Sequence, residues 1–254
     1  MSVEIIDFHT HPFLRVEDCI CKYKDTTPVS VELTGRDLSG LGISRFCGSV
    51  IGGRGEGFSR NAQNNADAYA LQTMYGGAYI PGIQVHGDFV DESCRAMDEA
   101  LARGGNLVGE LVPATYGWSY GDEGFRRILD HASGKGMVFS LHTMVSEELE
   151  RVLADYRDVT FVLAHPGEQK TLFWHIEQMK KNDNVYLDLS GTGLFRFGML
   201  SKLVSEVGAE RILFGSDYPV CNAGMYVGGV LAERISDDAK EKIFAGNAKR
   251  LLKL

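Results

Sequence analysis

The chain has 254 residues, of which 44% are hydrophobic and 24% charged, a balance typical of globular proteins that excludes collagen-like, coiled-coil and disordered chains. The 34 acidic residues exceed the 26 basic ones and give a net charge of −8, which argues against a broad nucleic-acid surface. No segment has the ~18 consecutive apolar residues of a membrane helix, and the five cysteines are an odd number. We therefore expect a cytoplasmic protein with reduced thiols and with neither membrane nor nucleic-acid partners.

Eight short segments rich in β-branched and aromatic residues recur along the chain, with helical patterns between them. Several are apolar almost throughout, as strands of a parallel sheet covered on both faces are. No long polar linker divides the chain, and about 250 residues is the usual size of one (β/α)₈ barrel. We expect an α/β fold, a single TIM-barrel domain over residues 1–254. The expected strands are Val3–His9, Ile43–Ile51, Ala78–His86, Leu107–Val112, Met137–His142, Thr160–His165, Val185–Ser190 and Arg211–Asp217.

Three of the intervening segments carry clear helix signals. The first expected helix lies near Val31 to Leu41. Asp91 is the expected N-cap of a second helix, which would stop at Gly104-Gly105. Ser146 is the expected N-cap of a third, because two glutamates follow it and then an apolar stripe with helical spacing.

Histidines and carboxylates fall at the carboxyl ends of the expected strands, where barrel enzymes carry their active sites. Side chains two residues apart on a strand point the same way, so His9 and His11 would face one site. Imidazole nitrogens and carboxylate oxygens are the ligands of zinc and similar divalent ions. We expect one metal site from these strand ends. Its candidate ligands are His9, His11, Glu110, His142, His165 and Asp217.

Any one of these residues alone could be a buried core histidine or a turn carboxylate. Their arrangement at corresponding ends of five strands favours a shared function. His86 also ends an expected strand and could face the site. His131 and His175 fall on helical segments, so we expect them to be structural.

The ordered set DFHTHP, VGELVP, SLHT, VLAHPGE and ILFGSDYPV, closing with GNAKRLLKL, resembles the amidohydrolase superfamily. More narrowly, it resembles the amidohydrolase-related branch of TIM-barrel metal-dependent hydrolases, and the likeness runs from Asp7 to the last residue. The resemblance implies that His9, His11 and Asp217 bind metal. It implies that His142 and His165 are either ligands of a second ion or a ligand and a catalytic partner.

Two features depart from the superfamily pattern. Many members carry a carboxylated lysine at the end of the fourth strand, where this chain has Glu110. A glutamate there resembles TatD-type nucleases, in which it bridges two ions. We expect Glu110 to bridge two ions, the alternative being a hydrogen bond to a ligand histidine beside a single ion. The chain is also short for the decarboxylases of the branch.

A bound divalent ion, most simply zinc, would lower the pKa of a water molecule and polarise a substrate carbonyl. Asp217 is the candidate general base, and His165, if it is not a ligand, would donate a hydrogen bond to the developing oxyanion. Asp7 could accept an imidazole N–H and fix the tautomer of a ligand histidine.

Arginines follow several of the expected strands. Arg54, Arg60 and Arg196 are the candidate substrate-binding residues, and Arg15 lies in a similar place. Each could be an ordinary solvated charge, but together they favour a small anionic substrate, such as a carboxylate. The segment PATYGWSYG offers three aromatic side chains, either as a pocket wall or as packing beneath a loop.

Three classes of function remain open at this stage. The leading hypothesis is a metal-dependent hydrolase of an amide, ester or lactone, with a TatD-like nuclease as a minor variant. The alternative is a nonoxidative metal-dependent decarboxylase of the amidohydrolase-related branch. The third is a non-catalytic barrel that binds metal or a partner. A homo-oligomer is compatible with all three.

Overall fold

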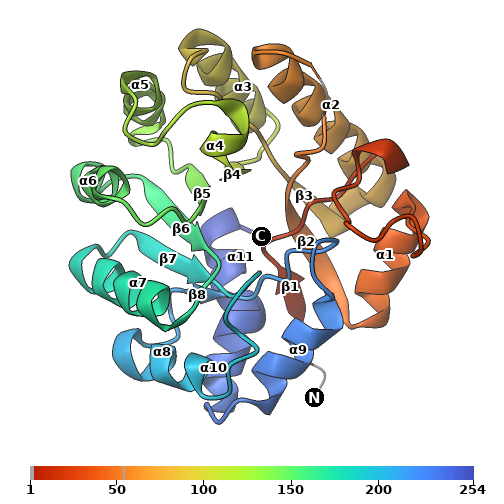
Figure 1. The fold of residues 1–254 in the computed structure, drawn as a ribbon, viewed down its shortest axis with the longest axis vertical. Helices are drawn as coiled ribbons and strands as arrows, with labels where there is room; N and C mark the ends of the chain where they lie inside the picture. Colours follow the sequence, from red (N-terminus) through yellow and green to blue (C-terminus); the bar gives the residue numbers. More distant parts are fainter. Residues whose placement is uncertain (1–2, 54) are drawn as a thin grey trace.

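Eight parallel strands form a ring with helices around it (Figure 1) in the computed structural model, which describes residues 3–53 and 55–254. Strand and helix alternate from the amino end, as expected for this fold class. The strands are β1 Ile5–Asp7, β2 Ile43–Ser49, β3 Tyr79–Gly82, β4 Leu107–Leu111, β5 Val138–His142, β6 Thr160–Ala164, β7 Val185–Asp188 and β8 Ile212–Leu213.

The ring is closed by short contacts between two regular sheets. Strands β1 to β3 form one parallel sheet, and β4 to β8 form the other. An isolated parallel bridge between Ile83 and Val108 joins β3 to β4, and one between Thr10 and Tyr218 joins the ends of β1 and β8. The expected TIM barrel is confirmed.

The helices pack outside the strands and cover their apolar outer faces. Among the described residues, no helix is both long and apolar enough to cross a membrane. The α-helices are α1 Val31–Gly40, α2 Phe58–Tyr75, α3 Val90–Ala102, α4 Pro113–Tyr116, α5 Glu123–Ala132, α6 Glu147–Asp155, α7 Gln169–Lys181, α8 Met199–Val207, α9 Ala223–Ala232, α10 Asp237–Glu241 and α11 Asn247–Leu252, with short 3₁₀ turns η1 Val16–Asp18 and η2 Gly76–Ala78 and a π-helical turn η3 Lys242–Gly246.

Two of the three helix predictions are confirmed as stated and one needs a correction. Helix α1 covers the expected segment, and Ser146 caps α6 by accepting a hydrogen bond from Leu149 N at 3.2 Å. Asp91 is not an N-cap, because α3 already begins at Val90. Asp91 lies in the first turn instead, where its negative charge interacts favourably with the positive end of the helix dipole.

One end of the barrel is filled and the other carries the polar residues. At the filled end, inward side chains pack with the last helix, α11, which lies across the centre of the ring in Figure 1. The side chains of this layer are apolar apart from the Cys47 thiol. Its members are Ile6, Phe8, Cys47, Leu107, Val138, Val162, Leu213, Ala245, Ala248 and Leu252.

The regular strands are shorter than the sequence predicts. Strand β1 stops before His9, and β8 stops well before Asp217. Beyond these points the backbone still pairs, with Asp217 N donating to His9 O at 2.8 Å. However, Asp217 adopts a left-handed conformation with φ of 61°. The residues that form the polar end thus lie on irregular extensions of the strands.

Candidate metal-dependent active site

Two histidines after β1 lie deepest in the polar end. His9 and His11 are 1% and 3% exposed, and their Nε2 atoms are 3.2 Å apart. His9 Nδ1–H donates to Asp188 Oδ2 at 2.9 Å. His11 Nδ1–H donates to the Ser49 carbonyl at 3.0 Å. These acceptors select Nδ1 as the protonated nitrogen, so both Nε2 lone pairs point to the same place.

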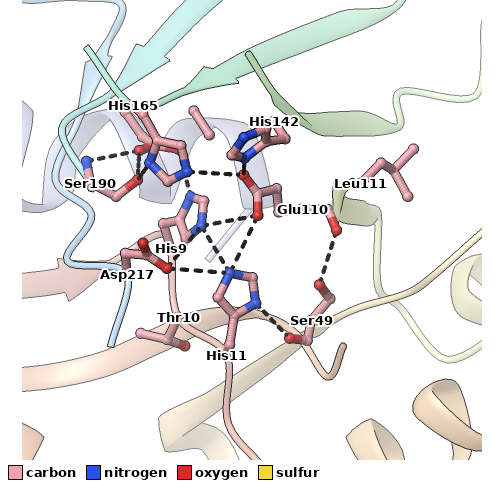
Figure 2. A network of polar contacts seen from close by, with 12 residues as sticks. His9, Thr10, His11, Ser49, Glu110, Leu111, His142, His165, Ser190 and Asp217 are labelled. Carbon is pink, nitrogen blue, oxygen red and sulfur yellow. Dashed lines mark hydrogen bonds and ion pairs between the residues drawn. The ribbon is translucent and has the colours of Figure 1, made fainter. Parts of the chain in front are cut away.

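Two carboxylates approach this pair of nitrogens from β4 and from the segment after β8 (Figure 2). Glu110 Oε2 lies 3.4 Å from His11 Nε2 and 3.6 Å from His9 Nε2. Asp217 Oδ1 lies 3.5 Å and 3.9 Å from the same two atoms. The ligand atoms of His9, His11 and Asp217 all lie within 4.8 Å of one another, as do those of His9, Glu110 and His165.

Glu110 reaches the barrel interior through an irregularity in β4. The pairing of β4 with β5 shifts in register between Val108 and Leu111. Gly109 lies within this shift at φ of 97°, and a Cβ there would come within 2.2 Å of the Ser140 carbonyl oxygen. Glycine is therefore required, and the irregular backbone brings Glu110 to the histidines.

The second oxygen of Glu110 faces the other two histidines. Glu110 Oε1 lies 2.9 Å from His142 Nδ1 and 3.3 Å from His165 Nε2. His165 has φ of 67°, a conformation uncommon for a non-glycine residue and frequent at functional sites. The structure thus brings all six candidate ligands together, with Glu110 between the two histidine pairs. His142 belongs to neither compact group and its side chain is 39% exposed.

The chemistry of these donor atoms fits a divalent cation. Imidazole lone pairs and carboxylate oxygens are all acceptors, and placing them 3 to 4 Å apart in a buried space is costly unless a positive centre lies among them. His9, His11 and Asp217 would hold one ion, and Glu110 and His165 lie where they could hold the same ion or a second one.

The charges around His9 point the same way. Burial alone would lower the pKa of His9, but the carboxylates of Asp188 and Glu110 outweigh burial and raise it well above the usual value. Burial opposes ionisation of Glu110, yet the charge that His9 carries when protonated and the contacts with three further histidines hold the pKa of Glu110 well below its usual range. The carboxylates therefore favour a positive charge at the point where the Nε2 atoms meet.

The expected role of Asp7 is wrong, and a residue that sequence reasoning missed has that role. Asp7 Oδ1 accepts the backbone N–H groups of His9 and Ser216, at 3.1 Å and 3.0 Å. These buried amides need an acceptor, and the carboxylate satisfies them instead of an imidazole. Burial raises the pKa of Asp7 to about 7. Asp188, at the end of β7, orients the His9 ring instead.

The three candidate substrate-binding arginines differ in their surroundings. Arg54 lies outside the described residues. Arg60 is half-buried, with its guanidinium 4.6 Å from the centre of the Tyr116 ring. Its Nε is buried without a hydrogen-bond partner among the described residues. Arg196 is exposed and already paired with Glu168, at 3.1 Å.

The aromatic segment after β4 serves mainly as packing. Trp118 and Tyr120 are 6% and 3% exposed, and Tyr120 donates to the Leu111 and His142 carbonyls at 2.9 Å and 3.1 Å. The His86 ring lies against Trp118 and Phe89, and its Nδ1 accepts from a nearby backbone amide. His86 is therefore part of this aromatic cluster rather than of the ligand groups.

The two helical histidines have structural surroundings. His131 is part of a surface ion-pair cluster, 2.9 Å from Asp98. His175 is fully buried on α7, and its Nε2 lies 3.0 Å from Thr143 Oγ1. Thr143 is the residue that follows His142.

The sequence pattern of the amidohydrolase family matches residues 6–254, which include every candidate ligand. The chain belongs to this family. One curated relative of the amidohydrolase is the gamma-resorcylate decarboxylase of a Polaromonas species, 40% identical over 73 residues. That match covers 29% of this chain and only 22% of the decarboxylase.

Solved structures share the fold of this amidohydrolase over nearly its whole length. An uncharacterised TIM-barrel protein from Bordetella bronchiseptica is 24% identical with a TM-score of 0.75, covering 98% of both chains. The 5-carboxyvanillate decarboxylase of Novosphingobium aromaticivorans, complexed with manganese and 4-hydroxy-3-methoxy-5-nitrobenzoic acid, is 14% identical with a TM-score of 0.73. The alignment covers 100% of this chain and 97% of that decarboxylase.

Proposed function

We propose that this amidohydrolase is a metal-dependent, nonoxidative decarboxylase of a small aromatic carboxylic acid. The observation that carries the proposal is the segment 40% identical to gamma-resorcylate decarboxylase. The structural likeness to a carboxyvanillate decarboxylase is consistent with it. Together they favour the decarboxylase alternative over the hydrolase that leads on sequence motifs alone.

The proposed reaction breaks the bond between a ring carbon and the carboxylate carbon. The electron pair stays on the ring carbon, which takes up one proton, so R–COO⁻ and H⁺ give R–H and CO₂. Asp217 and His165 are the groups that would hold and move this proton, since their side chains are 11% and 17% exposed beside the buried histidines. His9 and His11 are too deeply buried to reach a ring carbon and would act as ligands.

The proposed ion is held by His9, His11 and Asp217, with Glu110 and His165 completing its surroundings or holding a second ion. When bound, it would supply a positive charge that binds and polarises the oxygen atoms of the substrate. The imidazole and carboxylate donors suit Zn²⁺. Manganese in the carboxyvanillate decarboxylase makes Mn²⁺ the second ion to test.

Arg60 is the proposed anchor for an anionic group of the substrate. Its guanidinium stacks on Tyr116 and donates a long hydrogen bond, 3.4 Å, to the Ile51 carbonyl. Arg60 lies in the first turn of α2 and contacts the segment after β2, in which Ile51 is two residues beyond Ser49, whose carbonyl orients His11. A planar guanidinium of this kind binds a carboxylate through paired hydrogen bonds.

The test is the release of CO₂ from a panel of hydroxylated benzoates labelled at the carboxyl carbon, with Zn²⁺- and Mn²⁺-loaded protein. Labelled CO₂ with no incorporation of oxygen from ¹⁸O-water into the ring product is the expected result. Oxygen incorporation during cleavage of lactones, esters or amides, with no CO₂ from any acid, would overturn the proposal.

A hydrolase remains the second candidate because Glu110 lies between two histidine pairs, an arrangement suited to two ions. In that reaction Asp217 would accept the proton of the attacking water. The same ¹⁸O experiment separates the two candidates, since hydrolysis consumes water and decarboxylation does not.

A further inference from the structure

A short chain of hydrogen bonds connects two of the site histidines through the end of β7. Asp188 is fully buried, and its Oδ2 lies 2.9 Å from His9 Nδ1. Its other oxygen, Oδ1, accepts from Ser190 N at 2.9 Å and from the Ser190 hydroxyl. The Ser190 oxygen lies 3.0 Å from His165 Nδ1 (Figure 2). One carboxylate therefore reaches His9 directly and His165 through a serine.

The hydrogens available to these four residues determine which group donates in each hydrogen bond. Every neighbour of Asp188 within hydrogen-bond distance has a hydrogen to donate, so both carboxylate oxygens act as acceptors. The Ser190 hydroxyl has one hydrogen, which it donates to Asp188. Only the lone pairs of Ser190 remain for His165, so His165 Nδ1 must carry the hydrogen.

The backbone packs closely around this chain of hydrogen bonds, and Ser190 is the acceptor that lies beside His165 Nδ1. A Cβ on Gly191 would lie 2.3 Å from His165 Nδ1, and Gly191 has φ of 62°. A Cβ on Gly215 would lie 2.8 Å from His9 Cβ and 3.3 Å from Asp188 Oδ1. Both positions require the absence of a side chain, because the main chain passes directly beside the two ends of the hydrogen-bond chain.

We infer that Asp188 and Ser190 are positioning residues that hold His9 and His165 in the same Nδ1–H tautomer, with both Nε2 lone pairs turned to the metal centre. The inference rests on the metal centre of the proposed function, but not on the reaction. It narrows the role of His165: in its neutral form the ring is a ligand or a proton acceptor, and it donates a hydrogen bond from Nε2 only after taking up a proton. The oxyanion-donor role expected from the sequence therefore needs the protonated ring.

The first experiment reads the tautomers directly in the wild-type protein. Long-range ¹H–¹⁵N spectra of ¹⁵N-histidine-labelled, Zn²⁺-loaded protein distinguish Nδ1–H from Nε2–H rings, and the His165→Gln variant assigns the signal of His165. We expect the Nδ1–H pattern for His9 and His165. An Nε2–H pattern for His165 overturns the inference whatever the variants do.

The second experiment removes only the serine oxygen. Ser190→Ala should weaken Zn²⁺ binding about 10- to 100-fold in calorimetry, the usual effect of losing a group that orients a metal ligand. Ser190→Thr, which keeps the hydroxyl, should restore the affinity. Ser93→Ala is the matched control, because Ser93 is a buried serine that bonds the His86 backbone and touches no candidate ligand.

The outcomes separate this inference from the proposed reaction. Unchanged Zn²⁺ affinity and an unchanged His165 signal in Ser190→Ala overturn the positioning role. The expected tautomers and affinities in a protein that releases no CO₂ from any acid support the positioning role and count against the reaction alone.

Discussion

The two halves of the candidate site are held with very different firmness. In the deep half, His9 and His11 are nearly inaccessible, and the Nδ1 of each ring has a fixed acceptor, Asp188 or the Ser49 carbonyl. In the mouth half, which is represented by His142, the side chain is 39% exposed and, among the described residues, its Nδ1 has one hydrogen-bond partner, the carboxylate of Glu110.

The difference separates a half that is suited to binding an ion from a half that can rearrange. Imidazole rings whose Nδ1 atoms are held by buried acceptors can bind an ion through Nε2 without rearranging. The deep half is therefore suited to permanent metal binding. A ring oriented by a shared carboxylate can turn when that carboxylate changes partners. The mouth half is therefore the part that would respond to a substrate or to a second ion.

The largest expected effect comes from destroying the deep half. Replacing both His9 and His11 by alanine should remove the bound ion and reduce turnover about a thousandfold or more, because the several kcal/mol of charge stabilisation from the ion are lost. Elemental analysis and a turnover assay measure the two effects. His131→Ala is the control, since His131 lies in a surface ion-pair cluster. Metal at the wild-type level in the double variant would show that the site assignment is wrong.

The next effect concerns the connection between the halves. Under the bridging hypothesis, Glu110→Gln lowers the metal stoichiometry from two towards one and reduces turnover strongly, because an amide bridges two cations poorly. Metal titration by calorimetry measures the change. A single binding event in both the wild type and the variant would refute the two-ion arrangement and leave the barrel and the deep half unaffected.

A third prediction concerns the support behind the mouth half. His175 is fully buried beside Thr143, and burial lowers the pKa of His175 to about 4. As the pH falls below about 6.5 the unfolded chain takes up a proton there and the folded chain does not, so the contribution to stability is present above 6.5, falls towards pH 4 and then levels off. The loss is about 3 kcal/mol.

Comparison with His175→Gln isolates this contribution, because glutamine keeps a neutral N–H donor and does not titrate. Urea unfolding between pH 7 and pH 4 should show the wild type losing stability relative to the variant as the pH falls. Parallel curves for the two proteins would contradict a neutral buried His175.

The smallest expected effect tests whether substrate enters from the Arg60 side of the mouth. Arg60→Ala should raise the KM for acidic substrates by an amount corresponding to about 1.5 to 3 kcal/mol, the usual value of a hydrogen bond to a charged group. Arg196→Ala should have less effect, since Glu168 already pairs with its guanidinium. A preference for neutral compounds that neither variant alters would exclude an anionic substrate anchored there.

Much of the fold and the ligand set follows from short-range patterns in the sequence. His9 and His11 are two residues apart at the end of the first strand, so their spacing alone predicts that the two side chains point the same way. The cap at Ser146 is equally local. The exact strand ends are not, because the left-handed conformations of His165 and Asp217 depend on packing at the barrel end.

The orienting residues were harder to predict because their partners are far away in the sequence. Asp188 contacts His9 across a separation of 179 residues, and no local sequence pattern around Asp188 predicts that contact. A usable signal did exist: Asp188 and Ser190 are two apart at a strand end, the same spacing as His9 and His11. Asp7 is nearer to His9 in the sequence, but its carboxylate accepts hydrogen bonds from two backbone amides instead.

The joint that closes the barrel lies at the candidate metal site. Strand β8 has only two residues, and beyond it the first and last strands are joined by the bridge from Thr10 to Tyr218 and by the hydrogen bond from Asp217 N to His9 O. His9 and His11 lie on one side of this joint and Asp217 on the other, so an ion bound between them would hold the first and last strands together. Binding of this kind stabilises the folded state by about 4 kcal/mol when the free ion is a thousandfold above its Kd. Chelation should therefore increase hydrogen exchange first along this joint.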